Sequence, residues 1–420
     1  MGAHTPCQRS QLMQSDLPKQ NTRILFHAPG LAAHRPAMDL PHVLGVQPAT
    51  MHSIQGLLTS HELTGNRGNI IHAEAPAKLF KRDPLGSAYG NIGKLHKHLG
   101  DAFADRMAEL FDMIVISMAN FIRPDHSVEN LGHALVALDG RVPFIVLGAG
   151  LQGRHELSAI RRGSVDTIGV INERAALFGV RGEETCGWLH KHGFKKAEVL
   201  GCPSLYVYPQ SIMLLDPTAA RQKGANASVM TAGHLAIKQG NIVRRGTDLV
   251  RALAGTDASY VMQDEFIRYP GLRHRPCIYS DGNSQFDSGF MNAWLTERYK
   301  RPVSFRNYYY FNESGAWRQS ALRHDVFIGD RFHGGVAALQ AGLPTIFLKE
   351  DNRVGELTDY FALPALSISQ FTELGLAKTL EKMLDDGKIT LMKTRYRQRF
   401  RHFRKRMKEQ GLTVVSRLPD

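Results

Sequence analysis

The sequence predicts an α/β protein built from two Rossmann-like lobes that face a cleft. Short apolar, β-branched runs alternate with amphipathic stretches along the 420 residues, and this alternation is typical of βαβ units around a parallel sheet. It breaks off once near the middle of the chain and then resumes. The length also suits two domains, because one domain usually has roughly 100 to 200 residues.

The first lobe is expected over residues 23–210. Its helices should include 99–111, whose large apolar residues fall on one helical face, and 183–194, which ends at Gly193. Because each buries a face and glycine is typical of helix C-termini, both should cover the sheet. Its strands are expected at the apolar runs 112–118, 143–147, 165–172 and 197–200.

The second lobe is expected over residues 228–390. Residues 211–227, rich in proline, glycine and small polar residues, should be the linker that precedes it. The clearest unit lies between Arg323 and Leu348, where an apolar run, a loop, a helical stretch and another apolar run follow one another. The strands are expected at 228–230, 258–262, 303–305, 326–328 and 345–348.

Residues 1–22 are expected to be a flexible leader, because they are polar and lack the apolar core of a secretory signal. The most apolar stretches fall well short of the roughly 20 residues that cross a bilayer. The four cysteines contain no C-x-x-C pair, which indicates neither a structural zinc site nor a disulfide scaffold and fits a reducing compartment. We therefore expect a cytoplasmic protein.

The net charge of +13 is concentrated near the C-terminus. Nine Lys and Arg residues and no acid lie between Lys393 and Lys408, so the body of the protein is only mildly basic. Four large apolar residues recur there at spacings of four, three and four, which predicts a basic amphipathic helix within 391–420. They are Tyr396, Phe400, Phe403 and Met407.

This basic helix has two interpretations. Its aromatic stripe can dock onto a lobe and leave the charges in solvent, which is the interpretation we favour. Alternatively, it can bind anionic lipid or a lipid-linked acceptor at the inner membrane face, since each Lys or Arg near an acidic membrane contributes roughly 1 kcal/mol. Nucleic acid is not expected as a partner, because no recognition motif accompanies the charge.

The strongest candidate site is the motif Gly-Asp-Arg-Phe-His-Gly-Gly after the strand expected at 326–328. Open α/β sheets bind ligands at the carboxyl ends of their strands. Gly334 permits a tight turn into a helix whose first N–H groups favour anions. Arg331 offers a charged fork for a carboxylate or phosphate, and His333 titrates near neutral pH. The structural alternative is that Arg331 pairs with a local acid and His333 bonds a buried carbonyl.

Three further segments are weaker candidates. In the loop 64–69, the amides of Asn66 and Asn69 could cradle an oxygen-rich ligand. A plain turn is the interpretation we favour on local grounds, and the loop matches neither standard nucleotide motif. Arg181 precedes a helical stretch and adds a second cation. We interpret the glycines of 148–154 as turn geometry, and Cys202 as a small buried thiol.

Together these motifs resemble the polysaccharide pyruvyl transferase family. They occur in the family's order between Leu63 and Pro364, and the Arg-x-His-Gly element with its helix is the most specific. One departure follows the strand at 112–118, where the family often has a Gly-Gly pair and this chain has Met118-Ala119-Asn120-Phe121. The motifs read GNRGN, VRGEET, LGCPS and DRFHGGVAALQAGLPTIFL followed by KEDNRVGEL.

The resemblance implies a fold similar to GT-B glycosyltransferases and transfer of a pyruvyl group from phosphoenolpyruvate to two hydroxyls of a sugar. The product is a cyclic ketal on a polysaccharide or glycolipid precursor, with release of phosphate. Arg331 and His333 match the phosphoenolpyruvate end, and Arg181 is a second anion ligand. His333, its pKa raised by the donor's charge, would protonate the methylene carbon. No metal or cofactor is expected. Further substrate-binding residues are Gly334, Asn66 and Asn69.

Two other functions fit the same architecture. A GT-B glycosyltransferase that uses a nucleotide sugar needs the same two lobes and an Arg-containing loop. A non-catalytic sugar- or anion-binding protein would keep the cleft without the chemistry. Assays with phosphoenolpyruvate against nucleotide sugars distinguish these functions.

Overall fold

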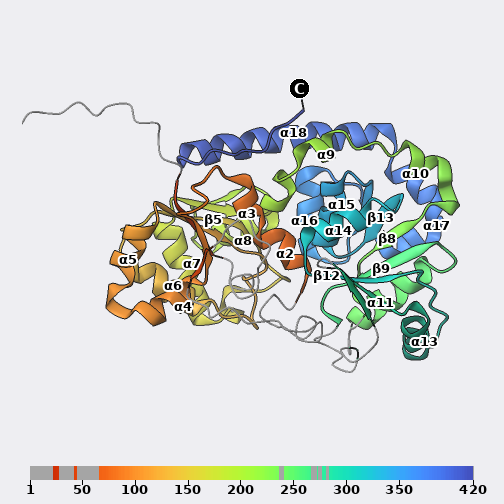
Figure 1. Cartoon of the computed structure of the whole chain (residues 1–420), viewed down its shortest axis with the longest axis horizontal. Coiled ribbons are helices and arrows are strands. Elements are labelled where there is room, and N and C mark those ends of the chain that lie inside the picture. The colour runs from red at the N-terminus through yellow and green to blue at the C-terminus, as the bar shows by residue number, and fades with distance from the viewer. Residues whose placement is uncertain are drawn as a thin grey trace, which may run out of the picture.

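The chain forms two α/β lobes side by side, with one long C-terminal helix laid across both (Figure 1). The predicted fold class is confirmed. In the described residues, no helix is long and apolar enough to cross a membrane. The computed structural model describes residues 22–27, 42–44, 66–235, 241–265, 272, 277–280 and 283–419. The expected leader therefore lies almost entirely outside the described residues.

The first lobe contains a fully parallel sheet, seven-stranded in the part of the chain that is described. Its central strands are buried on both faces, as their unbroken apolar runs predict. Three of the four strand predictions are confirmed. The strand order is β2 (His42–Leu44), β3 (Ala88–Gly90), β1 (Ile24–His27), β4 (Met113–Ser117), β5 (Phe144–Ala149), β6 (Leu177–Val180) and β7 (Ala197–Val199).

Helices cover this sheet, and one of them corrects a prediction. Residues 165–172 lie in α7 (Arg162–Arg174), because Ser164, Ile168 and Ile171 recur at helical spacing and are buried together. The β-branched composition misled the strand prediction. The other helices are α2 (Gly68–Ala73), α3 (Ala75–Leu79), α4 (Ile92–Leu99), α5 (Phe103–Leu110), α6 (Glu129–Ala137) and α8 (Glu183–Lys191).

The second lobe contains a mixed sheet, eight-stranded among the described residues, in which only the pairs β10–β11 and β11–β12 are antiparallel. The strand expected at 303–305 is wrong. Phe305 is buried, but its N–H donates to the Asn292 side chain instead of to a neighbouring strand. The strand order is β10 (Cys277–Ser280), β11 (Asn283–Phe286), β12 (Tyr308–Phe311), β9 (Ala258–Met262), β8 (Val229–Thr231), β13 (Val326–Gly329), β14 (Thr345–Leu348) and β15 (Ala365–Leu366).

The segment 211–227, expected to be an irregular linker, joins the two sheets but is partly helical. It contains the end of α9 (Pro209–Met213) and α10 (Thr218–Lys223), and α9 packs on α15 of the second lobe. The helices of the second lobe are α11 (Asn241–Ala252), α13 (Ser288–Tyr299), α14 (Ser314–Ala321), α15 (Phe332–Ala341), α16 (Asn352–Phe361) and α17 (Ile368–Met383).

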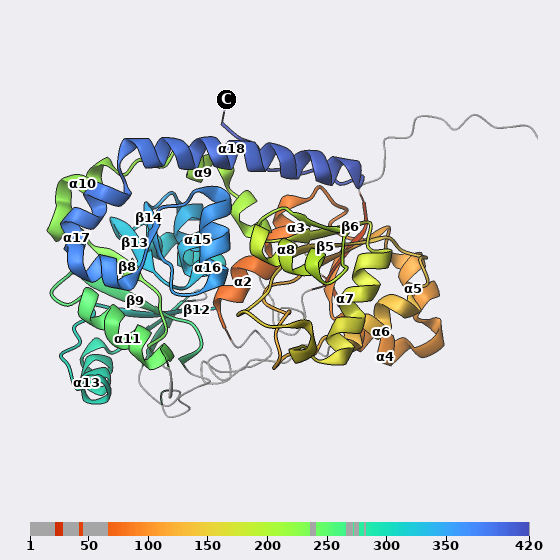
Figure 2. The same ribbon diagram turned by 180° about the vertical axis from the view of Figure 1, so that it is seen from behind.

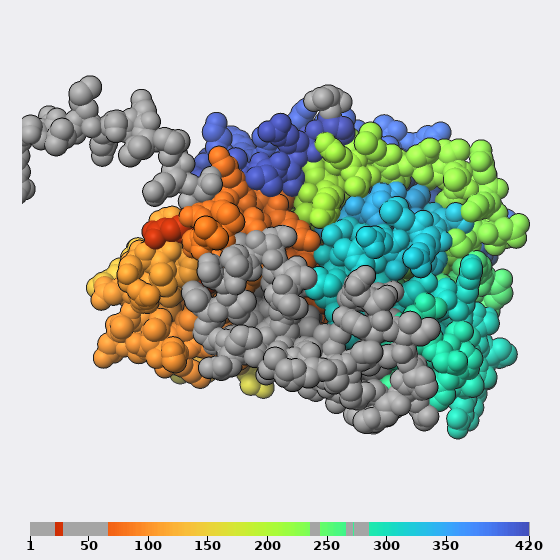
Figure 3. Space-filling model, in the orientation of Figure 1, coloured from red at the N-terminus to blue at the C-terminus, as the bar shows by residue number. Residues whose placement is uncertain are grey.

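The basic segment is the helix α18 (Asp386–Glu409), which lies over both lobes in front and rear views (Figures 1 and 2) and also in the space-filling view (Figure 3). Its predicted aromatic stripe is buried. The Phe403 ring stacks on Tyr206 with centroids 4.4 Å apart, and the Tyr396 hydroxyl donates to the Leu205 carbonyl at 2.7 Å. Burial of one such side chain contributes roughly 1.5–3 kcal/mol. The docking interpretation is therefore confirmed.

Candidate functional site

The segments that follow the strands of the two sheets contact each other along the boundary between the lobes. This is where open α/β sheets bind ligands. In particular, α2 of the first lobe packs directly against α15 of the second. Gly68 permits this approach, because a Cβ added there would lie 2.5 Å from Gln263 Oε1 and 3.2 Å from the Cβ of His333 in α15. That glycine therefore serves close packing as well as the turn.

His333 lies in the first turn of α15, beside side chains of the first lobe. Its Nε2 is 3.7 Å from Cys202 Sγ, and its ring centroid is 5.4 Å from that of His72 in α2. His72 Nδ1 is in turn 3.4 Å from the same sulfur. The predicted catalytic histidine is thus part of a His–Cys–His cluster, and His72 was missed because a histidine inside a short helix gives no sequence signal.

Burial, and then the charges around this cluster, favour neutral imidazoles in the free protein. Burial lowers the pKa of His333 well below 6.5, and the nearby His72, Arg353 and Arg181 lower it further. Burial also lowers the pKa of His72 to about 4. The pKa of His333 is thus lowered in the free protein, whereas the negative charge of a bound donor is expected to raise it. The same cations, however, would attract an anionic ligand.

Arg331 is buried and already paired. Its Nη2 donates to Asp264 at 2.5 Å, and its Nε donates to the Gly233 carbonyl at 2.9 Å. This matches the structural alternative of pairing with a local acid. Asp264 follows β9, and the adjacent Glu265 has its pKa raised to about 7 by burial and then by Asp264. Two acids directly after the strand at 258–262 were a sequence signal that went unused.

Arg181 follows β6 and reaches across the lobe boundary. It forms a buried ion pair with Glu356 of α16 and also donates to Asn120 and to the Leu151 carbonyl. The Met118–Phe121 loop that departs from the family pattern thus supplies a partner to this arginine. A Cβ at Gly150 would lie 2.2 Å from the Arg181 guanidinium carbon, so this glycine makes room for the guanidinium.

The two predicted asparagines help to form the start of α2. Asn66 Oδ1 accepts from the Gly68 N–H at 3.0 Å, and the Asn69 N–H donates to the Asn66 carbonyl at 2.9 Å. Between them lies Arg67, which is buried and stacks its guanidinium over the Tyr310 ring of the second lobe, 4.7 Å from its centroid. Sequence reasoning missed this lobe-to-lobe anchor.

A separate feature of the second lobe is a buried amide that has no partner among the described residues. Gln263 follows β9 and is 2% exposed, and its Nε2 makes no hydrogen bond. A Cβ added at Gly334, in the first turn of α15, would lie 3.3 Å from this nitrogen. Because buried donors are usually satisfied, the amide marks a place where a ligand oxygen could bind.

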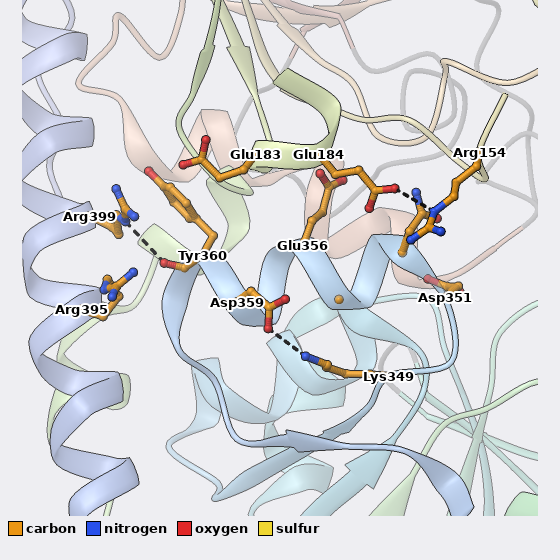
Figure 4. A pocket seen from close by; sticks show the side chains of 12 residues that line it. Arg154, Glu183, Glu184, Lys349, Asp351, Glu356, Asp359, Tyr360, Arg395 and Arg399 are labelled. Carbon is orange, nitrogen blue, oxygen red and sulfur yellow. Dashed lines mark hydrogen bonds and ion pairs between the residues drawn. The ribbon is translucent and has the colours of Figure 1, made fainter. Parts of the chain in front are cut away.

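A polar groove of about 780 Å³ opens beside Glu356, between α8, α16 and α18 (Figure 4). Glu183, Tyr360 and Arg399 line one end of it. Arg154 and Glu184 line the other end, and both signs of charge alternate along the walls. Such a lining suits a hydroxyl-rich ligand better than a purely anionic one.

A model of the family named polysaccharide pyruvyl transferase matches residues 66–352. The chain belongs to this family. The match begins at Asn66 and ends at Asn352, so it includes the His333 cluster, Arg331 and Arg181. Both motifs at the α2–α15 contact therefore lie within the region that defines the family. None of the curated proteins compared with the chain matches it.

Solved structures similar to this chain are distant in sequence. A UDP-GlcNAc 2-epimerase from Neisseria meningitidis bound to UDP-GlcNAc has 11% identity and a TM-score of 0.45, covering 82% of this chain and 98% of that chain. HepE from Anabaena in complex with UDP and glucose has 13% identity and a TM-score of 0.43, covering 93% and 99%. An Escherichia coli structure titled trehalose-6-phosphate, bound with UDP-2-fluoro glucose, has 12% identity and a TM-score of 0.45, covering 77% and 78%.

Proposed function

We propose that this protein transfers the pyruvyl group of phosphoenolpyruvate to two hydroxyls of one sugar and forms a cyclic ketal. Membership of the polysaccharide pyruvyl transferase family is the observation that carries the proposal. The α2–α15 contact supports it, because it combines an imidazole, a helix N-terminus and a free amide. No metal or cofactor takes part in the proposed transfer.

The start of α15 is the proposed donor site. The first amides of a ten-residue helix such as α15 attract phosphate or carboxylate, and Gln263 Nε2 supplies an additional donor beside them. Arg181 and Arg331 add positive charge, although their present partners are Glu356 and Asp264. We propose that Arg331 acts mainly by its charge and by holding the loop. Asn66 and Asn69 shape the facing wall at the start of α2, and Gly334 leaves room beside Gln263 Nε2 in the first turn of α15.

The proposed chemistry conserves all atoms of the donor and the sugar. His333 gives a proton to the methylene carbon, and a first sugar hydroxyl forms a bond to the adjacent carbon and loses its own proton. A second hydroxyl of the same sugar then attacks that carbon and gives its proton to the departing phosphate. The carbon–oxygen bond to phosphate breaks, and inorganic phosphate leaves. A well-placed acid of this kind contributes about 10²- to 10⁴-fold in rate.

The acceptor is a saccharide in a polysaccharide or glycolipid precursor, polymeric or lipid-linked. The groove between α8, α16 and α18 is the proposed place for its chain, because carboxylates, guanidinium groups and the Tyr360 ring can bind sugar hydroxyls and ring faces. The groove also borders α18. The exposed basic side chains of this helix are proposed to face an anionic membrane at the cytoplasmic side, and they are Arg397, Arg401, Arg404, Lys405 and Lys408.

The test incubates the full chain with phosphoenolpyruvate and a panel of sugars, and measures phosphate release together with the mass of the product. We expect one ketal per accepting sugar, and H333A should abolish turnover. H324Q is the matched control, since His324 is a partly buried histidine of the same lobe that bonds the Ser320 carbonyl. Turnover of a nucleotide sugar in place of phosphoenolpyruvate would contradict the proposal.

A further inference from the structure

Three side chains from separate segments place a nitrogen, a sulfur and a nitrogen close together. The atoms of His72, Cys202 and His333 all lie within 4.8 Å of one another. Among the described residues, no other group of three or more His, Cys, Asp or Glu residues converges in this way. Imidazole nitrogen and thiolate sulfur are the ligands that Zn²⁺ and other thiophilic cations prefer.

The two nitrogen–sulfur separations match a tetrahedral ion. With Zn–N bonds of about 2.0–2.1 Å and a Zn–S bond of about 2.3 Å, tetrahedral angles separate N and S by about 3.5 Å. The two observed separations from Cys202 Sγ are 3.4 Å to His72 and 3.7 Å to His333. Ser204 Oγ also lies 2.9 Å from this sulfur. The Cys202 thiol has one proton and can donate it to only one of its three neighbours, which are His72, His333 and Ser204.

The orientation of His72 is also that of a metal ligand. The Ser117 hydroxyl donates to the His72 carbonyl at 3.2 Å, and its oxygen lies 3.0 Å from His72 Nε2. Because the hydroxyl proton is used on the carbonyl, Nε2–H is the donor to the serine oxygen. His72 Nδ1 then presents its lone pair to Cys202. Metal-binding histidines usually donate their other ring N–H in this manner.

We propose that His72, Cys202 and His333 form a binding site for a thiophilic divalent cation such as Zn²⁺, and that the bound ion inhibits pyruvyl transfer. The ion occupies the His333 nitrogen that would otherwise protonate the donor. Three protein ligands leave a fourth position for water. His333 is less buried than the other two, so the ion enters from its side. The inhibition rests on the proposed function, whereas the binding does not.

The ion would also join the lobes, because His72 belongs to α2 and His333 to α15. A ligand that binds only the folded protein stabilises it by mass action. We therefore expect Zn²⁺ to raise the melting temperature of the full chain, and the increase should depend on all three side chains.

The binding test titrates the metal-free full chain with Zn²⁺ in competition with a chromophoric chelator, at one fixed pH. We expect one high-affinity ion per chain. Loss of a direct ligand in C202S or H72Q should weaken it by more than the about 10- to 100-fold typical of outer partners, and S117A should fall within that range. Melting curves show whether each variant is folded. If C202S does not fold, the Zn²⁺ affinity of H72Q decides the test.

The matched control is C186S. Cys186 is also buried and lies 3.6 Å from one imidazole, His190 Nε2, but belongs to no such group of three. C186S should bind Zn²⁺ as the wild type does. Absence of a stoichiometric ion, or equal binding by folded C202S and the wild type, would overturn the site.

The inhibition is tested by phosphate release from phosphoenolpyruvate at increasing Zn²⁺ concentration. We expect release to stop as the site fills, and S117A should need about tenfold more Zn²⁺ for half-inhibition. Undiminished release with the site filled would overturn the inhibitory role. Absence of release without Zn²⁺ would instead overturn the proposed function, and the binding titration, which contains no substrate, would be unaffected.

Discussion

Arg181 and Glu356 form an ion pair buried across the boundary between the lobes, with side chains 4% and 3% exposed. Glu356 also accepts from the Thr185 N–H at 3.0 Å and from its hydroxyl. The carboxylate of one lobe is therefore satisfied by groups of the other. Glu356 also lines the groove beside α18, and Arg181 is one of the cations that lower the pKa of His333, so a change here acts on both the fold and the site.

Removing Glu356 should destabilise the protein strongly. E356A leaves the Arg181 charge buried without its carboxylate, which typically costs about 3–5 kcal/mol. Urea titrations measure this loss as the difference in free energy of unfolding between E356A and the wild type. The control is D105A, which breaks the exposed Arg141–Asp105 pair, with side chains 49% and 74% exposed. That change should stay within about 1 kcal/mol, and equal losses in the two variants would contradict the assignment.

The docking of α18 predicts that its aromatic stripe stabilises both lobes. F403A removes the ring that stacks on Tyr206 and should cost about 3–5 kcal/mol. A truncation after Met392 should lower the melting temperature and activity together. L391A is the control, since Leu391 lies in the same helix but is 53% exposed, and it should be nearly neutral. A stable, active truncation would show that the stripe is dispensable.

The exposed face of α18 predicts salt-sensitive binding to acidic vesicles. Reversing the charges of Arg401, Arg404 and Lys405 should abolish the binding, because each contributes roughly 1 kcal/mol near an anionic surface. The melting temperature should hardly change, since these side chains are exposed. Vesicle sedimentation measures binding, with the exposed Lys94, Lys97 and Lys300 reversed as a charge-matched control. Vesicle binding retained by the α18 variant would rule out this face.

The free amide of Gln263 predicts a contribution to donor binding without a cost to the free protein. Phosphoenolpyruvate at a hundred times its dissociation constant should stabilise the wild type by about 2.7 kcal/mol. In Q263M the affinity should fall about tenfold or more, because hydrogen bonds to charged groups contribute about 1.5–3 kcal/mol. The free variant should be no less stable than the wild type, since the lost amide nitrogen has no partner among the described residues.

The matched control for this experiment is Q340M. The Gln340 amide donates to the Ser204 carbonyl at 2.7 Å and accepts from Arg318 at 3.2 Å. Q340M should therefore lower the stability of the free protein and keep the thermal shift with phosphoenolpyruvate. The reverse pattern in the two variants would assign Gln263 a structural role only.

The lowered pKa of Asp330 predicts that the protein loses part of its stability in acid. Burial tends to raise its pKa, but His234, Arg245 and Arg331 outweigh burial and lower it from 3.8 to about 2. A lowered carboxyl pKa contributes stability that is present above the ordinary value and is lost as pH falls through the folded value. The contribution is about 2 kcal/mol. In urea unfolding, the free energy of unfolding of D330N should lie below that of the wild type by the full amount at pH 7. The difference should shrink between about pH 4 and 2. A deficit independent of pH would contradict this.

The fold class and the main motifs were predictable from local patterns. Continuous apolar runs identified β4, β5, β9 and β13, because strands buried on both faces have no polar side. The apolar run 326–328 and the glycines on both sides of Arg331 and His333 indicated where α15 begins. The strand expected at 165–172 was wrong because β-branched composition was weighed above the helical spacing of Ile168 and Ile171.

The sequence by itself determined which residues follow the strands, and therefore that Arg181, Arg331 and His333 would lie near the lobe boundary. Only the tertiary structure decided what each one contacts. Arg331 pairs with Asp264, Arg181 pairs with Glu356, and His333 contacts Cys202, which lies 131 positions away in the sequence. Asp264 and Arg331 meet because the strands that precede them lie in the same sheet, whereas the other two pairs meet because the lobes pack against each other. Long-range packing of either kind leaves no local pattern in the sequence.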